Sequence, residues 1–345
     1  MAVDRLSSLL TTDRPQWGVV FLGLFLLAVP GMSLVGFAVV GAVREAESIV
    51  LSGVLLLLAL LALRGIAFEL RMVRAAPEIE SIEPTEMRGI AGAILVGGFV
   101  TFVLVVEGRL TPVVAASLTG LLAVVVRRPL AVPAYCGAFV GMTSPIVFPT
   151  YWQGLVAATL AVAVYLLAQP VFHGVGGKLG TTAFVGAALT ILGTPTSFLG
   201  DQLPASDTVG LVVAFSVVAA VVTFTLHHRS PLDPVSASGV VGLLGGVALP
   251  WLYPVVGDLL AAAIYAASFA GMSDSTRIPD ERWMALAGIV VGLVVVYTAP
   301  YLGGSGGKLG TIAFISCLAV YGLLGTVYHV LVKIHVERLP RRDVS

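Results

Sequence analysis

A six-residue segment that contains a lysine occurs twice in this otherwise apolar chain. Gly-Gly-Lys-Leu-Gly-Thr stands at 176–181 and again at 306–311, and both copies are followed closely by Ala-Phe. Glycines permit tight turns, a threonine can cap the start of a helix, and such a turn can bind an anion. The residues predicted to bind a lipid headgroup or another anion are Gly176, Gly177, Lys178, Thr181, Gly306, Gly307, Lys308 and Thr311.

The repeated segment does not fit a nucleotide-binding phosphate loop. That loop needs a glycine six residues before its lysine and a serine or threonine directly after it. Phe172 and Leu179 hold these positions in the first copy, and Leu302 and Leu309 hold them in the second. The alternative to an anion site is a tight interhelical turn whose lysine extends to the lipid headgroups.

A second repeated pattern combines aromatic residues, glycine and methionine. Tyrosine and phenylalanine four residues apart share a helix face, and the polar segments 143–145 and 273–275 follow. The pattern predicts two helix ends that line a solute pathway, and ordinary helix packing at the glycines is the alternative. The predicted pathway residues are Tyr135, Phe139, Gly141, Met142, Tyr265, Phe269, Gly271 and Met272.

The other ionisable side chains form no catalytic set. His227 and His228 adjoin Arg229, but neighbouring histidines on a helix point in different directions, and no carboxylate or cysteine completes a metal site. We therefore expect no metal, no cofactor and no catalytic residue, so that an enzyme is disfavoured though still open. Four further ionisable residues fall near the ends of apolar runs: Glu107, His173, Asp258 and Asp274.

Composition identifies the class of protein. Of the 345 residues, 58% are hydrophobic and only 11% are charged, and the mean hydropathy is +1.01. A soluble domain carries about 25% charged residues, so this chain cannot cover a surface that faces water. The sequence therefore predicts an all-α polytopic integral membrane protein, and no feature suggests nucleic-acid binding.

About twelve apolar segments are candidate membrane spans. A spanning helix needs about 20 apolar residues, and the fourth and ninth segments are short enough to be re-entrant instead. The first segment is interrupted by Pro30-Gly31. The segments run approximately over 17–43, 48–74, 89–106, 111–126, 129–146, 152–172, 179–199, 208–227, 236–250, 253–272, 284–302 and 309–333.

Basic residues indicate the orientation of these spans. Lysine and arginine concentrate in loops that face the cytoplasm, and the segment 333–345 at the end of the chain is strongly basic. With an even number of spans the N-terminus lies on the same side. We therefore expect a multi-pass protein of the cell membrane with both termini in the cytoplasm.

The two lysine segments belong to a longer internal repeat. At an offset of 130, 17 of the 50 pairs between 135–184 and 265–314 are identical, and upstream the offset becomes 122. Each repeat has five predicted spans, and an odd number makes the second repeat enter the membrane from the opposite side. The predicted organisation is a two-helix hairpin with a linker at 1–87, repeat 1 at 88–207, and an inverted repeat 2 with a basic tail at 208–345.

This five-plus-five layout is similar to that of several transporter and channel groups. We predict a membrane transporter, channel or facilitator for a small solute or ion, with its pathway at the interface of the repeats. The alternative is an intramembrane lipid-modifying enzyme or membrane assembly factor, in which Lys178 and Lys308 hold a phosphate-bearing headgroup. A structural or sensory membrane protein is a third reading. The expected partners are the lipid bilayer and a small solute, and a homo-oligomer is left open.

Overall fold

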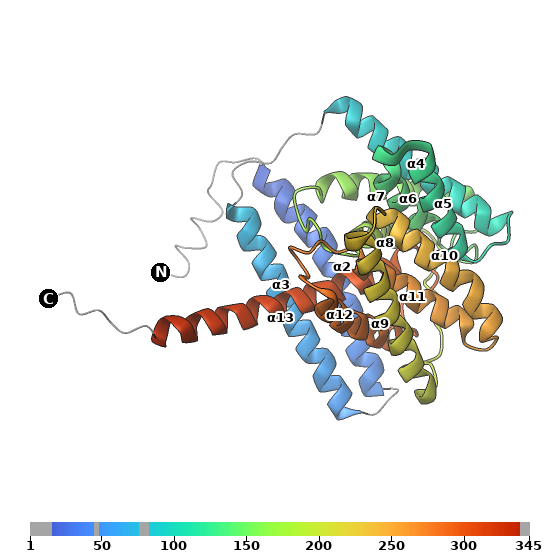
Figure 1. The fold of residues 1–345 in the computed structure, drawn as a ribbon. Coiled ribbons are helices and arrows are strands. Elements are labelled where there is room, and N and C mark those ends of the chain that lie inside the picture. Colours follow the sequence, from blue (N-terminus) through green and yellow to red (C-terminus); the bar gives the residue numbers. More distant parts are fainter. Residues whose placement is uncertain (1–15, 45–47, 76–82, 339–345) are drawn as a thin grey trace.

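The computed structural model describes residues 16–44, 48–75 and 83–338, which form helices and no β-strand (Figure 1). The two termini, predicted to be cytoplasmic, lie largely outside these residues. The helices are α2 (Gln16–Arg44), α3 (Ile49–Ala75), α4 (Pro84–Val106), α5 (Pro112–Arg127), a 3-10 turn (Arg128–Leu130), α6 (Ala131–Gly141), α7 (Tyr151–Leu167), α8 (Lys178–Leu192), α9 (Ser206–Arg229), α10 (Pro234–Leu252), α11 (Gly257–Gly271), α12 (Glu281–Tyr297) and α13 (Lys308–Arg338).

The helical membrane class is confirmed by length and apolarity, whereas twelve complete crossings stay a prediction. Helices such as α6 and α8 have 11 and 15 residues, which at 1.5 Å per residue are about 16 and 22 Å long, less than the bilayer core of about 30 Å. Seven segments of the described chain are long and apolar enough to cross: Trp17–Arg44, Ile49–Ala75, Pro84–Val106, Pro112–Gly141, Ser206–Arg229, Pro234–Leu252 and Lys308–His329.

The first apolar segment forms one unbroken helix, although the sequence suggested an interruption at Pro30-Gly31. Pro30 lies inside α2, which continues for 29 residues. A membrane helix tolerates an internal proline where neighbouring helices pack around the freed backbone groups. Gly31 lies against Ile315 and Phe314 of α13 at this point.

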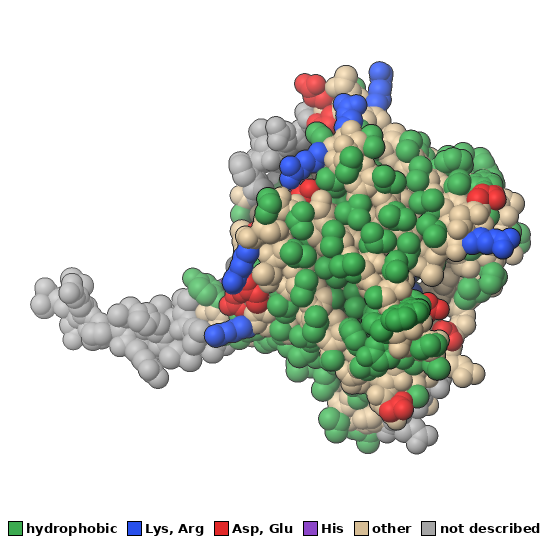
Figure 2. Space-filling view, turned by 45° about the vertical axis from the view of Figure 1, so that its right-hand side comes forward, with side chains coloured by type: hydrophobic (Ala, Val, Ile, Leu, Met, Phe, Trp, Pro, Cys, Tyr) green, Lys and Arg blue, Asp and Glu red, His purple; other side chains and the backbone are tan. Residues whose placement is uncertain are grey.

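The surface is consistent with a membrane environment. Figure 2 shows a face dominated by hydrophobic side chains, with most of the charged side chains toward its edges. Large apolar side chains are well exposed on several helices, for example Phe25 at 60%, Phe99 at 60% and Val125 at 84%. In water these faces would be unfavourable, whereas lipid tails solvate them.

The helix starts repeat at the same sequence offsets as the identities. Thr111 caps α5 by accepting from Val114 N, and Asp233, 122 residues later, caps α10 by accepting from Ser236 N. Proline follows both caps, at the first helical position that its fixed φ favours. These local signals start α5 and α10 at equivalent positions of the internal repeat.

Equivalent helices also pack against one another. The helix α4 packs on α6 and α7, and α9 packs on α11 and α12. Across the middle of the molecule α5 packs on α10, and α8 packs on α13. The helices α5 and α10 begin 122 residues apart, and α8 and α13 begin 130 residues apart, which are the two offsets of the internal repeat.

The first turns of α8 and α13 touch at two matching glycines, Gly180 and Gly310. A Cβ atom added to either glycine would lie 2.5 Å from the Cα of the other. Only a residue without a side chain permits this approach. The glycines of the repeated segment therefore fix where the two helices cross.

The hairpin α2–α3 lies along both units of the repeat, the first formed by α4–α8 and the second by α9–α13. The backbone of Gly23 in α2 contacts Leu167 O at the end of α7, and Gly41 contacts Tyr297 O at the end of α12, in the same close manner. The helix α3 packs tightly on α13, where Gly65 meets Leu318 O. Leu167 and Tyr297 stand at matching positions of the repeat, and they therefore contact α2 at residues that lie 18 positions apart.

We expect Gly180→Ala to destabilise the protein by about 1–3 kcal/mol, the usual cost of overpacking a tight core. The added methyl group overlaps the backbone of Gly310, which cannot rotate away. The measurement is thermal unfolding in detergent. Gly36→Ala in α2 is the control because no atom lies within 4 Å of its added Cβ. Equal melting temperatures for the two variants would contradict the close crossing.

Candidate functional site

The two segments that lead into Lys178 and Lys308, residues 172–178 and 302–308, are called the first and second lysine turns, and they share an unusual backbone. Phenylalanine and leucine are strained at positive φ, so surrounding contacts must hold both turns in place. Three matching pairs of positions have positive φ, and the angles within each pair differ by 5° or less: Phe172 (56°) with Leu302 (55°), Gly174 (70°) with Gly304 (75°), and Gly177 (81°) with Gly307 (82°).

Each lysine side chain binds backbone carbonyls just beyond the preceding helix. Lys178 Nζ donates to Val171 O at 2.5 Å, after α7. Lys308 Nζ donates to Tyr301 O at 2.5 Å and to Thr298 O at 2.7 Å, after α12. The ammonium groups therefore satisfy orphan carbonyls and complement the negative ends of these helices. The amines hold the fold in this structure, and anion binding by them stays a prediction.

Each turn is also fixed by a polar segment of the other unit. The segment after α11 contacts the first turn, and the segment after α6 contacts the second. Gly176 N donates to Ser273 Oγ at 3.0 Å, and Gly306 N donates to Thr143 Oγ1 at 3.0 Å. The two contacts therefore join residues at matching positions of the internal repeat, with the partners exchanged. The backbone adds a second exchanged pair, Asp274 N to Gly174 O at 2.9 Å and Ser144 N to Gly304 O at 2.8 Å.

Four predicted pathway residues meet as one aromatic cluster between α6 and α11. The rings of Tyr135, Phe139, Tyr265 and Phe269 lie with centroids 4.3–6.2 Å apart, and all four side chains are buried. Tilted and edge-to-face pairs of this kind contribute about 0.5–1.5 kcal/mol each beyond their area. The cluster joins the two units at their centre.

Hydroxyl groups surround the tyrosines of the aromatic cluster. Tyr135 OH lies 3.1 Å from Ser238 Oγ, which lies 2.8 Å from Ser268 Oγ. Tyr265 OH and Ser117 Oγ are buried and have no hydrogen-bond partner within the described part of the chain. Leaving a buried polar group without a partner costs about 1–3 kcal/mol. A further hydrogen bond to either hydroxyl would therefore be favourable.

A cavity of about 580 Å³ lies against the aromatic cluster. Phe139 and Phe269 are buried and line its inner part, together with Met142. The cavity extends past Lys308 to two exposed carboxylates, Asp201 and Asp258. It therefore connects the aromatic cluster and the second lysine turn with the surface of the molecule.

The two glycines among the predicted pathway residues, Gly141 and Gly271, pack against neighbouring helices and do not line this cavity. A Cβ on Gly141 would lie 2.4 Å from Gly98 O of α4, and one on Gly271 would lie 2.6 Å from the Cβ of Thr223 in α9. Of the eight predicted pathway residues, three line the 580 Å³ cavity: Phe139, Met142 and Phe269.

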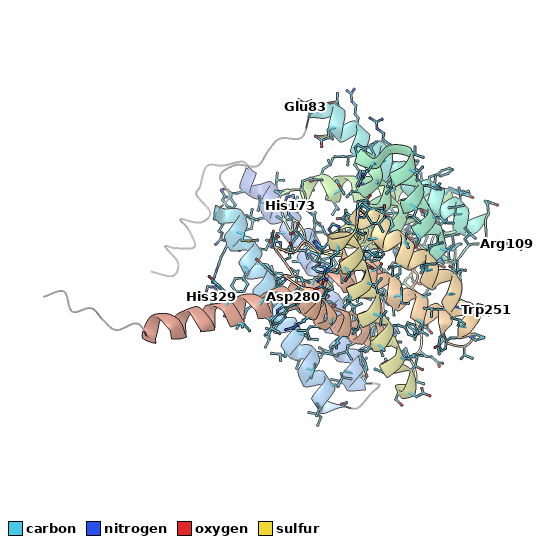
Figure 3. The ribbon with its side chains drawn as sticks, viewed as in Figure 1. Glu83, Arg109, His173, Trp251, Asp280 and His329 are labelled. Atoms are coloured by element: carbon cyan, nitrogen blue, oxygen red, sulfur yellow. The ribbon has the colours of Figure 1, made fainter. Side chains whose placement is uncertain are left out.

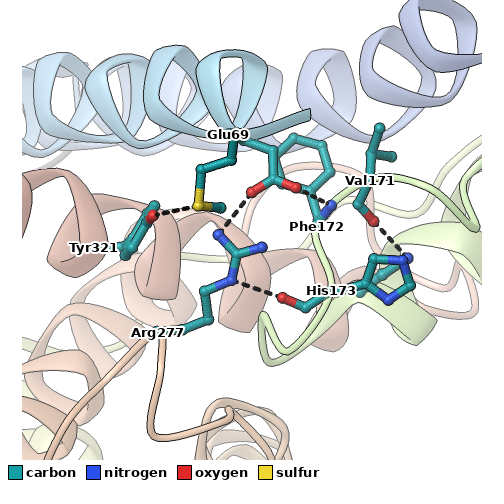
Figure 4. Close-up of polar contacts among 8 residues, drawn as sticks. Glu69, Val171, Phe172, His173, Arg277 and Tyr321 are labelled. Carbon is teal, nitrogen blue, oxygen red and sulfur yellow. Dashed lines mark hydrogen bonds and ion pairs between the residues drawn. The ribbon is translucent and has the colours of Figure 1, made fainter. Parts of the chain in front are cut away.

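A buried ion pair lies beside the first lysine turn (Figure 4). Glu69 of α3 and Arg277 are almost fully buried, and Glu69 Oε2 lies 2.7 Å from Arg277 Nη1. Glu69 Oε1 accepts from Phe172 N at 2.5 Å, and Arg277 Nε donates to His173 O at 2.7 Å. The pair thus ties the hairpin to the first lysine turn and to the loop after α11.

The loop that carries Arg277 is well ordered by its own hydrogen bonds. Asp274 Oδ1 accepts from Thr276 N at 2.8 Å, and this bond lowers the pKa of Asp274 below its ordinary value. The carboxylate is therefore charged at neutral pH. His228 Nε2, from the histidine pair noted in the sequence, lies 3.0 Å from Ser273 O in the same region.

The chain matches no family model, no curated protein and no solved structure. Function must therefore be argued from the site alone. The relevant features are the exchanged contacts between the lysine turns, the aromatic cluster, the cavity on one side and the buried ion pair on the other.

Two residues of this site were missed by sequence reasoning, Glu69 and Arg277. The sequence patterns described above give neither residue a role. The available signal was an acidic residue inside the apolar segment 48–74, because ionisable residues within membrane segments are costly and usually paired.

Replacing either lysine by methionine should lower stability by about 1–3 kcal/mol, because buried carbonyls lose their donor. We expect Lys178→Met and Lys308→Met to lower the melting temperature by similar amounts, since both amines bind the matching turn. Thermal unfolding in detergent measures this. Arg282→Met removes an exposed charge and should change little. Unchanged stability of both lysine variants would show that the amines do not hold the turns.

Proposed function

We propose that this chain is a membrane transporter or facilitator for a small solute or ion, with the pathway at the interface of two inverted repeats. The observation that carries the proposal is the 580 Å³ cavity, which ends on Phe139 and Phe269 where the two units meet. A site near the middle of such an interface is the common arrangement in secondary transporters.

The contacts of α2 support opposite orientations of the two repeats. Gly23 and Gly41 contact the matching ends of α7 and α12, and 18 residues of helix separate them by about 27 Å. That distance is close to the thickness of the hydrocarbon core, about 30 Å. If α2 crosses the bilayer, the two matching helix ends lie near opposite membrane surfaces.

The positions of two loops agree with the proposed topology. Arg109 follows the third predicted span and Trp251 follows the ninth, so both belong on the non-cytoplasmic side. Figure 3 places them at the same edge of the bundle. By the charge distribution, the cavity with Asp201 and Asp258 opens on that side, and both termini are proposed to be cytoplasmic.

The lining of the cavity favours a small solute of modest polarity. Its volume lies in the range of ligand sites, about 300–1,000 Å³. Apolar side chains form most of the wall, and Ser144, Ser305 and Thr111 add hydroxyl groups. The ammonium group of Lys308 is held by two carbonyls, so the remaining charges among the described lining residues are the exposed carboxylates of Asp201 and Asp258. A facilitator of a neutral solute fits these features best.

No observation specifically favours the lipid-modifying enzyme or assembly factor. That alternative needs free amines at Lys178 and Lys308, whereas both amines bind carbonyls.

Filling the cavity should stop transport without disturbing the fold. We expect Ala262→Phe, which projects from the cavity wall, to reduce solute flux into proteoliposomes by about tenfold or more. An added barrier of only about 1.4 kcal/mol suffices for that reduction. The measurement is the initial rate of uptake over a panel of small neutral and ionic solutes.

Val125→Phe is the matched control because Val125 is 84% exposed on the outside of α5. It should transport at the wild-type rate. If the wild-type protein moves no solute of the panel, or if both variants are equally active, the proposed function is wrong.

A further inference from the structure

The two tyrosines of the aromatic cluster stand at matching positions of the repeat, but their hydroxyl groups have different surroundings. Tyr135 OH lies 3.1 Å from Ser238 Oγ, which lies 2.8 Å from Ser268 Oγ. Tyr265 OH is fully buried and has no hydrogen-bond partner within the described residues. The two rings therefore occupy equivalent places, whereas their hydroxyl groups are not equally satisfied.

Alanine stands at both positions that correspond to the serines beside Tyr135. At the offsets of 122 and 130 these positions are Ala116 and Ala138. Because alanine has no hydroxyl group, the partners that satisfy Tyr135 OH have no equivalent for Tyr265 OH. The difference between the two tyrosines therefore follows from the sequence of the repeat.

A second buried hydroxyl group without a partner lies near Tyr265. Ser117 of α5 is fully buried, and its Oγ has no hydrogen-bond partner in the part of the chain that the structure describes. A Cβ atom added to Gly242 of α10 would lie 2.4 Å from Tyr265 Cδ2 and 2.6 Å from Ser117 Oγ. The serine and the tyrosine therefore meet at one point of α10. Each hydroxyl group can both donate and accept, so the pair would keep a free donor and a free acceptor even where one donated to the other.

Both residues stand next to residues that line the cavity. Residues four positions apart share a helix face. On α11, Ala261 and Phe269 line the cavity, and Tyr265 stands midway between them. On α5, Val113 lines the cavity, and Ser117 follows four residues later. One helical turn, about 6 Å along the axis, therefore separates each of the two residues from the cavity wall.

We propose that Tyr265 OH and Ser117 Oγ form the hydrogen-bonding subsite of the pathway, which receives a hydroxyl or amide group of a small uncharged solute. This inference rests on the transport function proposed above and names the chemical class of the solute. The rings of Phe139 and Phe269 line the inner part of the cavity beside Tyr265. A turn of either ring admits the polar group of the solute to the subsite.

The chemistry of the subsite selects against charged and against purely apolar solutes. Tyr265 and Ser117 carry no formal charge, and a buried ion without a counter-charge is costly. An apolar solute would leave both hydroxyl groups without a partner, whereas a hydroxyl or amide group can donate and accept. A site of this kind discriminates between solutes by whether they complete its hydrogen bonds.

Removal of each tyrosine hydroxyl group tests whether the two differ as described. Tyr135→Phe takes away a partner of Ser238, so we expect a lower melting temperature in detergent. Tyr265→Phe removes a hydroxyl group that has no partner, so its melting temperature should stay the same or rise. An equal loss in both variants would show that Tyr265 OH is already satisfied, and the subsite would be refuted.

Glycerol and acetamide are the probes for the hydroxyl and amide classes. The rise in melting temperature that each probe causes is compared between variants, because a general solvent effect is the same in all of them. Bound solute stabilises the folded protein, so we expect a smaller rise in Tyr265→Phe and in Ser117→Ala than in the wild type. Tyr135→Phe is the matched control and should keep the wild-type rise.

Uptake into proteoliposomes provides the second measurement. The initial rate for the probe that binds should fall about fivefold in Tyr265→Phe, which is the factor expected for one hydrogen bond between uncharged groups. A similar fall is expected in Ser117→Ala, and Tyr135→Phe should transport at close to the wild-type rate.

The two measurements separate the subsite from the transport function. If the wild type takes up a probe and neither Tyr265→Phe nor Ser117→Ala changes the rate, transport stands and the subsite is wrong. A probe-dependent rise that is lost in Tyr265→Phe, in a protein that shows no uptake, supports the subsite and refutes transport. Equal rises in the wild type and Tyr265→Phe for both probes, without uptake, would refute both.

Discussion

The approach of α8 and α13 at Gly180 and Gly310 is the constraint on which the centre of the molecule depends. Two helices can start this close together only where neither carries a side chain. The turns before the helices must then bend sharply, which explains the left-handed glycines. The exchanged hydrogen bonds from Gly176 N to Ser273 and from Gly306 N to Thr143 follow, because each turn is brought against the end of α11 or α6.

A chain this apolar must satisfy its buried polar groups internally. Both repeated lysines do so by binding carbonyls beyond the ends of α7 and α12, and Glu69 does so by binding Arg277 and a backbone N–H group. The same requirement thus produces lysine contacts with carbonyls in one place and, in another, a buried ion pair that joins α3 to the first lysine turn.

Much of the arrangement near the aromatic cluster could be predicted from the repeat. Long apolar runs identify membrane helices because length and hydropathy set that class, and the offset of 130 correctly paired Tyr135 and Phe139 with Tyr265 and Phe269. The partners of the lysines could not be predicted, because they are backbone carbonyls that leave no mark in the sequence. Gly141 was predicted to line a pathway but packs on α4, since glycine patterns look the same in both situations.

The contacts of α2 have a mechanical consequence for any rearrangement of the two units. Gly23 and Gly41 of α2 closely contact the C-terminal ends of α7 and α12. If either unit slid along α2, these close contacts would be lost. The hairpin α2–α3 thereby sets how far apart the ends of α7 and α12 lie along one helix.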